Sequence, residues 1–234
     1  MSKQQSVFAG AIDKIVSDCN DQLQWVPYSK DHLTKEAARG LIEQWSSFTR
    51  TAGNAGLMLS AIVRSLKFAS LSLPKISTMK RPRRDSHFEI LARMGRALGL
   101  TRDEILNARP LPTTVVAMHA WEALTKNRTW YEGLSAKSVL ERTNNPNCGN
   151  FSHYQADHWM RQLGLTKEDT EFWWMHDSVD QIHGDGSLKL LENYLTTDAE
   201  RNAALRVAEE SMMAWQVYFD GFYYEGLRRT AAKG

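Results

Sequence analysis

The sequence predicts an all-α protein built as one helical bundle. Apolar residues recur at steps of three and four along most of the chain, the spacing of a buried helix face, as in Leu205, Ala208, Met212, Trp215, Phe219 and Phe222. Glycine, proline and helix-capping residues separate these stretches, and no stretch alternates as a strand does. We find no internal repeat. We therefore expect a single domain over residues 1–234, with the bundle at about 34–226 and a peripheral segment at about 1–30.

Composition and charge exclude several classes of protein. The 234 residues carry a formal charge of +2, which gives no reason to invoke nucleic acid or an anionic membrane as a partner. Charged residues such as Arg64 and Lys67 interrupt the longest apolar stretches, so none is suited to span a bilayer. The N-terminus lacks the apolar core of a signal peptide, and Cys19 and Cys148 are too few for a disulfide framework. We expect a soluble, cytoplasmic protein.

In the N-terminal half, the periodicity predicts helices that are separated by helix-ending and helix-capping residues. The expected helices span residues 7–18, 34–50, 57–73, 86–98 and 101–107. Residues 25–28 form a connection, Pro74 ends the third helix, and Asp85 or Ser86 caps the fourth. The connector at 75–86 is strongly basic, and a solvated loop is its simplest interpretation.

The C-terminal half continues the pattern. The expected helices span 113–125, 130–142, 152–163, 166 to about 183, and 198 onward. Ser152 is the expected cap of the third of these, with Gln155 at the capping-box position. Gly184 and Gly186 loosen the end of the fourth, and Asp198 caps the last. Residues 144–149, rich in asparagine, form the clearest loop in the chain.

The most informative stretch is the helix that contains His176, Asp180 and His183. At about 100° per residue, positions i, i+4 and i+7 fall within about 40° of one another on one helix face. The neighbouring residues are largely apolar or aromatic, and polar groups buried there without partners would be costly. A transition metal would supply the partner, because imidazole and carboxylate suit iron, manganese and zinc. A solvated polar stripe with incidental histidines is the alternative.

Such a site would need donors from other helices, because bundles build metal centres from facing side chains. His87 is in register with Leu91 and Met94, which predicts that it faces the core. A buried histidine without a metal is the alternative for this residue.

Glu132 is the candidate carboxylate on the helix at 130–142. It is in register with Ala136 and Val139, and a buried carboxylate there would need a compensating partner. His119 and Glu122, on the preceding helix, are its rivals.

Taken together, these residues resemble a known family. The order His87, Glu132 and His176-x3-Asp180-x2-His183 is similar to the ligand pattern of the haem-oxygenase-like dimetal (di-iron) oxidases. Those proteins are seven-helix bundles related to pyrroloquinoline-quinone synthase and to thiaminase-II-like proteins. The resemblance covers about residues 34–226 and is strong at three short motifs, at 87–100, 130–135 and 176–183. It implies a single haem-oxygenase-like bundle.

The resemblance also implies a cofactor and a role for each donor. His87, Glu132, His176, Asp180 and His183 would bind two Fe(II) ions that activate O2, with Glu132 between the metals. No catalytic residue beyond the metal ligands is implied. The family normally carries a glutamate seven residues before the first histidine, and this sequence has Lys80 there. The second iron would therefore be incompletely liganded unless water or the substrate completes its site.

Function follows from the same resemblance. We expect an O2-activating oxidase or oxygenase in natural-product biosynthesis that acts on a small molecule. The expected substrate is derived from an amino acid and can be aromatic. The expected reaction is an oxidative rearrangement, a C–C cleavage, or the formation of a nitrile or an N-oxygenated product. Lys80 and Arg84 would bind its carboxylate, and Trp130, Tyr131 and Trp173 would pack against its body. An external electron donor and a homodimer are both compatible with this interpretation.

Three alternatives stay open. A metal-independent oxidase resembling pyrroloquinoline-quinone synthase is favoured by the absent glutamate and disfavoured by the intact H-x3-D-x2-H motif. A non-catalytic helical scaffold would need none of the histidines. Thiaminase-like chemistry is disfavoured because Cys148 lies in the asparagine-rich loop.

Overall fold

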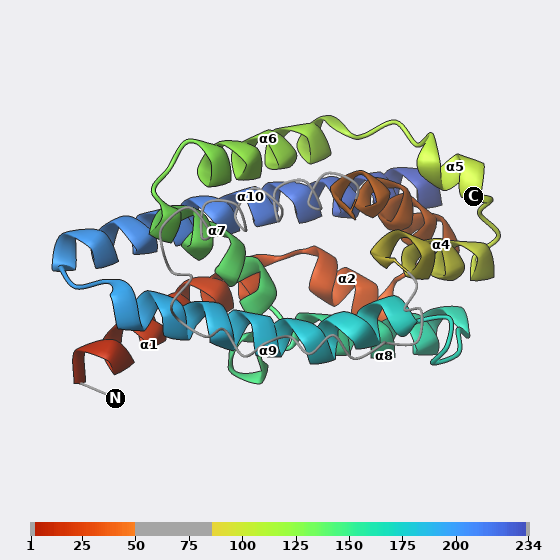
Figure 1. The fold of residues 1–234 in the computed structure, drawn as a ribbon. Helices are drawn as coiled ribbons and strands as arrows, with labels where there is room; N and C mark the ends of the chain where they lie inside the picture. Colours follow the sequence, from red (N-terminus) through yellow and green to blue (C-terminus); the bar gives the residue numbers. More distant parts are fainter. Residues whose placement is uncertain (1–2, 50–85, 233–234) are drawn as a thin grey trace.

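The computed structural model describes residues 3–49 and 86–232, and within these ranges it contains helices, turns and loops but no strand (Figure 1). The all-α prediction is confirmed. The expected helix at 57–73 and most of the basic connector lie outside the described residues. The elements are α1 (Lys3–Gln22), α2 (Trp25–Asp31), a helical stretch at 35–49, α4 (His87–Ala97), α5 (Arg102–Leu106), α6 (Pro112–Lys126), α7 (Trp130–Arg142), the 3₁₀ turn η2 (Pro146–Cys148), α8 (Phe151–Leu163), α9 (Glu171–Tyr194) and α10 (Asp198–Ala231).

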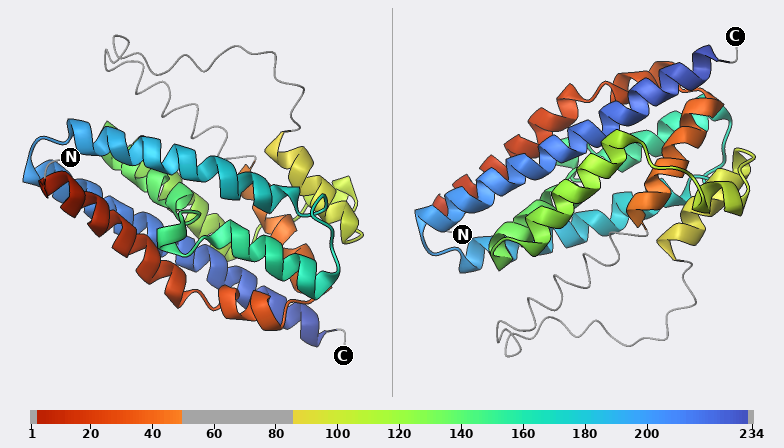
Figure 2. Two further views of the ribbon diagram at one scale, coloured as in Figure 1. Left: turned by 90° about the horizontal axis from the view of Figure 1, so that it is seen from below. Right: turned by 90° about the horizontal axis from the view of Figure 1, so that it is seen from above.

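Helix α10 is the longest element and the one around which the others pack. Its 34 residues span about 51 Å, and α1, α6 and α7 all pack against it. Helix α9 packs against α7 and also contacts α8. Helix α7 therefore lies between α10 and α9 (Figures 1 and 2). Aromatic rings fill the centre, where Trp45 contacts the rings of Tyr218, Phe219 and Phe222. Trp45 also contacts the rings of Phe172 and Trp173, so this core joins α10 to α9.

The N-terminal segment, expected to be peripheral at about 1–30, packs into the bundle through α1. Phe8, Ile12 and Val16 are buried in the common core, because their spacing of four residues puts them on one face of α1. The expected connection at 25–28 is the start of α2. Pro27 fits there because the first turn of a helix needs no partner for its backbone nitrogen.

Three expected helix boundaries are also wrong. Helix α9 continues through Gly184 and Gly186 to Tyr194. Gly184 allows α9 to approach α7 closely, since a Cβ there would lie 3.0 Å from Arg142 Cγ. Asn150, in the left-handed region with φ of 48°, is the N-cap of α8 in place of Ser152. Thr197 caps α10 one residue before the expected Asp198.

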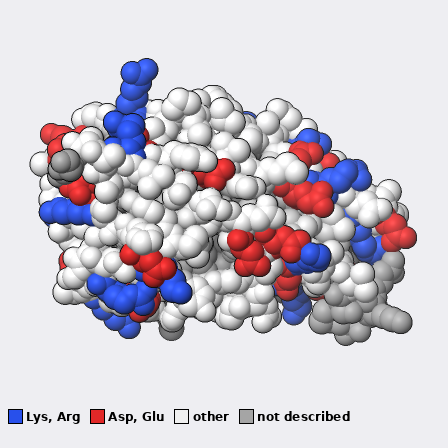
Figure 3. All heavy atoms as spheres, turned by 180° about the vertical axis from the view of Figure 1, so that it is seen from behind, with Lys and Arg blue, Asp and Glu red and all other residues white. Residues whose placement is uncertain are grey.

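The surface agrees with the small net charge. On the face shown in Figure 3, Lys and Arg side chains lie close to Asp and Glu side chains rather than forming a field of one sign. Among the helices that the structure describes, none has both the length and the apolar character needed to cross a membrane.

Candidate metal centre

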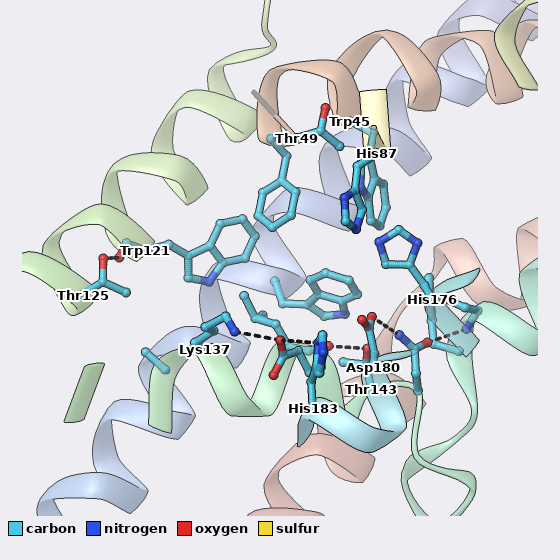
Figure 4. Close-up of a pocket in the computed structure, with 18 of the residues that line it drawn as sticks. Trp45, Thr49, His87, Trp121, Thr125, Lys137, Thr143, His176, Asp180 and His183 are labelled. Carbon is cyan, nitrogen blue, oxygen red and sulfur yellow. Dashed lines mark hydrogen bonds and ion pairs between the residues drawn. The ribbon is translucent and has the colours of Figure 1, made fainter. Parts of the chain in front are cut away.

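His176, Asp180 and His183 line one cavity, as their spacing on α9 predicts. The cavity has a volume of about 480 Å³ and lies between α9, α7, α6, α10 and the helical stretch 35–49, with His87 of α4 at one side. Figure 4 shows the labelled side chains of α9 and His87 around the same space. The three residues share the cavity as their spacing predicts, and His87 lies beside His176, but His87 and His183 are exposed rather than buried in the core.

The two histidines His87 and His176 face each other, with ring centroids 5.3 Å apart. His176 Nδ1 donates to the backbone carbonyl of Phe172 at 2.7 Å, because a carbonyl oxygen can only accept. This bond leaves the Nε2 lone pair of His176 free to bind a metal. Burial lowers the pKa of His176, and burial together with the charges of His176 and His183 lowers the pKa of His87. Both rings therefore favour the neutral form, which is the form that binds metals.

Asp180 is a carboxylate in an environment that disfavours its charge. Burial and the nearby Glu141 raise the pKa of Asp180 to about 7, although a hydrogen bond from Asn144 and the charge of His183 act in the opposite direction. Asn144 Nδ2 donates to Asp180 Oδ2 at 2.8 Å. A cation bound beside Asp180 would relieve the cost of its burial.

Glu132, the residue predicted to lie between two metals, does not line this cavity. It lies in the first turn of α7, where its carboxylate accepts hydrogen bonds from Thr129 N at 3.0 Å and Thr129 Oγ1 at 2.6 Å. Although partial burial acts against it, these bonds and the charges of Arg128 and Arg206 lower the pKa of Glu132. The capping-box signal Thr-x-x-Glu at 129–132 was present in the sequence and identifies this role.

The carboxylate that α7 brings to the cavity is Glu141, in its last turn. Its Oε1 accepts from Lys137 Nζ at 2.9 Å and lies 3.7 Å from His183 Nδ1. Its Oε2 is buried and has no hydrogen-bond partner among residues 3–49 and 86–232. Sequence reasoning missed Glu141 because α7 is buried on several sides, as Leu134, Ala136 and Val139 show, and such a helix does not reveal which face lines a site.

The rest of the cavity wall is mainly aromatic. The rings that line it belong to Trp45, Phe48, Trp121, Phe151 and Trp215. The aromatic residues predicted for substrate binding, Trp130, Tyr131 and Trp173, are not among them, and Trp173 is buried in the core against Trp45 and Trp159. Lys80 and Arg84 lie outside the described residues.

The two rivals to Glu132 differ in position. Glu122 also lines the cavity, where Lys126 pairs with it, whereas the side chain of His119 is 75% exposed. Glu122 thus already has a cation as a partner. It is less suited than Glu141 to bind a metal, because Glu141 keeps a buried oxygen without a partner.

The donor types around the cavity fit iron, although the donor side chains lie apart from one another. Imidazole nitrogens and carboxylate oxygens suit Fe(II), and the unpartnered Glu141 Oε2 is an acceptor that a cation would satisfy. Within residues 3–49 and 86–232, no three His, Cys, Asp or Glu side chains are gathered closely enough to hold one ion as they stand.

Comparisons with known proteins give the family and the fold. Residues 80–217, more than half of the chain, match the model of a family described as iron-containing redox enzyme. A crystal structure of a domain of unknown function with a heme oxygenase-like fold, from Shewanella denitrificans OS217, is similar with a TM-score of 0.71 and 15% sequence identity, over 95% of this chain and 91% of that chain. A search of curated proteins gives no match.

Proposed function

We propose that the chain, which belongs to the family of iron-containing redox enzymes and has a heme oxygenase-like fold, is a non-haem di-iron oxidase or oxygenase that uses O2 to oxidise a small molecule. The observation that carries the proposal is the shared cavity, to which α4, α7 and α9 each bring donors suited to iron.

The proposed ligands are His87, Glu141, His176, Asp180 and His183, with Glu141 taking the role first assigned to Glu132. Glu141 is suited to a shared position because its two oxygens differ, one paired with Lys137 and the other buried without a partner. Ferrous iron bound by these residues would supply the electrons that reduce O2. A sixth donor is not assigned, since the position at which the family normally has glutamate is Lys80, outside the described residues.

The remaining residues of the cavity would bind and enclose the substrate. A volume of about 480 Å³ suits a small organic molecule, and the aromatic rings provide an apolar wall that excludes water. Two ammonium groups, of Lys126 and Lys137, also line the cavity. We propose an amino-acid-derived substrate whose apolar part packs against Trp45, Trp121 and Trp215, and whose carboxylate is bound by cations, with Lys80 and Arg84 as further candidates.

Anaerobic reconstitution tests the proposal directly. The protein is loaded with Fe(II), freed of excess metal and assayed for bound iron by elemental analysis. We expect close to two irons per chain for the wild type, and a loss of most bound iron in His176→Ala and His183→Ala. Exposure to O2 should then oxidise the bound iron, which Mössbauer spectroscopy detects.

A control variant separates loss of ligands from loss of fold. His119→Ala removes a histidine that is exposed on α6 and should keep the iron content of the wild type. Iron-free protein that still consumes O2 with a bound substrate would contradict the proposal and favour a metal-independent oxidase. Protein that neither binds iron nor consumes O2 would favour a non-catalytic role.

A further inference from the structure

The asparagine-rich loop between α7 and α8 makes contacts with α9 that the proposed function does not use. Asn144 Nδ2 donates to Asp180 Oδ2 at 2.8 Å, and Asn145 Nδ2 lies 3.4 Å from Asp185 Oδ1. With its amide nitrogen directed toward α9, Asn150 donates to Asp177 Oδ1 at 3.0 Å. Three asparagines of one loop thus contact three aspartates of the helix that carries the proposed ligands.

Asn144 differs from the other two because its aspartate partner, Asp180, lines the cavity. Its Oδ1 accepts from the backbone nitrogen of Ser152 at 2.8 Å, in the first turn of α8. That nitrogen is one of the donors that a helix start leaves without an internal partner. The side chain of Asn144 is only 4% exposed. The backbone contact therefore fixes which way the amide points, and Asn144 can only donate toward Asp180.

The position of Asn144 in the chain ties this contact to Glu141. Asn144 follows Glu141 by three residues, and its backbone nitrogen bonds the carbonyl oxygen of Glu141 at 3.3 Å. Both residues line the cavity. The end of α7 therefore supplies one proposed ligand directly and holds a second one, Asp180, through the asparagine amide.

We propose that Asn144 is a positioning residue: its amide, locked by Ser152, holds one oxygen of Asp180 and leaves the other for the metal. The proposal rests on the proposed function, since it assigns Asn144 a role through a metal ligand. Groups that hydrogen-bond a ligand set its orientation, and their loss typically lowers metal affinity by about 10–100-fold.

The test compares two variants of the same loop. Asn144→Asp keeps the shape of the side chain and an acceptor for Ser152, but it removes the donor to Asp180. Asn145→Asp makes the same chemical change one residue away, where the side chain faces Asp185. Co(II) is the probe, titrated anaerobically into metal-free protein and followed by its visible absorption bands.

We expect the affinity for Co(II) to fall about 10–100-fold in Asn144→Asp, with altered absorption bands, and to stay within about twofold of the wild type in Asn145→Asp. In an Asp180→Ala background, Asn144→Asp should cause no further loss, because the residue acts through Asp180. If Asn144→Asp does not fold, Asn144→Ser replaces it with the same expectation.

The outcomes distinguish this inference from the proposed function. A wild-type protein that binds Co(II) together with an Asn144→Asp variant of unchanged affinity overturns the inference alone. So does an equal loss in Asn145→Asp, or a further loss in the Asp180→Ala background, since each indicates a general effect on the loop. A wild-type protein that binds neither Co(II) nor Fe(II) overturns the proposed function and this inference with it.

Discussion

The two ends of α7 carry glutamates that are equally buried and have different roles. The side chains of Glu132 and Glu141 are 14% and 13% exposed, and their separation of nine positions places them on opposite faces of the helix, roughly 13 Å apart along its axis. Glu132 is surrounded by donors from Thr129 and by the guanidinium of Arg128. Glu141 pairs with Lys137 through one oxygen and leaves the other without a partner.

The difference shows that burial alone does not identify a functional carboxylate. A carboxylate such as Glu132, which accepts two hydrogen bonds from its own helix start through one oxygen and pairs with Arg128 through the other, has a structural role, because these contacts account for its position. A buried oxygen without a partner costs free energy, and a ligand that supplies the partner recovers it. The contrast between Glu132 and Glu141 can be tested by exchanging one functional group at a time.

The largest effect is expected for iron binding. Glu141→Gln keeps the size of the side chain and removes the charge that would bind iron, so we expect the affinity for Fe(II) to fall by about 100-fold or more, beyond the loss expected for a supporting group. Glu132→Gln is the matched control and should keep the iron content of the wild type, since glutamine also serves in a capping box. Elemental analysis after anaerobic reconstitution measures both. Equal iron loss in the two variants would contradict the assignment of different roles to Glu132 and Glu141.

An intermediate effect is expected where α9 crosses the Glu141 end of α7. A Cβ at Gly184 would lie 3.0 Å from Arg142 Cγ and 3.4 Å from Arg142 N. Arg142 cannot move away easily, because its guanidinium binds Asp13 and Asp185. We expect Gly184→Ala to destabilise the fold by about 1–3 kcal/mol and to lower iron content by separating Glu141 from His183.

Gly186, two residues further along α9, is the control for that substitution. A Cβ there meets no atom within 4 Å, so Gly186→Ala should stabilise the helix by about 0.5–1 kcal/mol. Urea denaturation of the metal-free variants measures both changes. If Gly184→Ala is as stable as Gly186→Ala, the close packing of the two helices does not constrain the site.

The smallest effect concerns the pH dependence of stability at the Glu132 end. The pKa of Glu132 lies below its ordinary value of 4.5, so the ionised carboxylate stabilises the fold above that pH, and the contribution is lost as pH falls through the lowered pKa. Glu132→Ala should cost about 1 kcal/mol at pH 7. The difference from the wild type should shrink below pH 4.5, as measured by denaturation at a series of pH values. A difference that is constant with pH would contradict the assigned capping role.

Sequence patterns recovered most helices because the relevant forces act between near neighbours. The face shared by His176, Asp180 and His183 follows from helix geometry alone, and Ser86, one of the two expected caps, caps α4. The expected connection at 25–28 and the expected helix end at Gly184 are both helical, because Pro27 lies in a first turn and Gly184 packs against Arg142. The Thr129–Glu132 capping box could have been recognised from its spacing.

By itself, the sequence determined that the chain is a helical bundle and that α9 presents two imidazoles and a carboxylate on one face, because both depend on residue spacing within a helix. Only the tertiary structure decided which carboxylate of α7 meets that face. Helix α7 packs against α9, α6 and α10, so apolar residues occur on several of its sides and no periodicity singles out the cavity. The selection of Glu141 over Glu132 depends on how the helices cross.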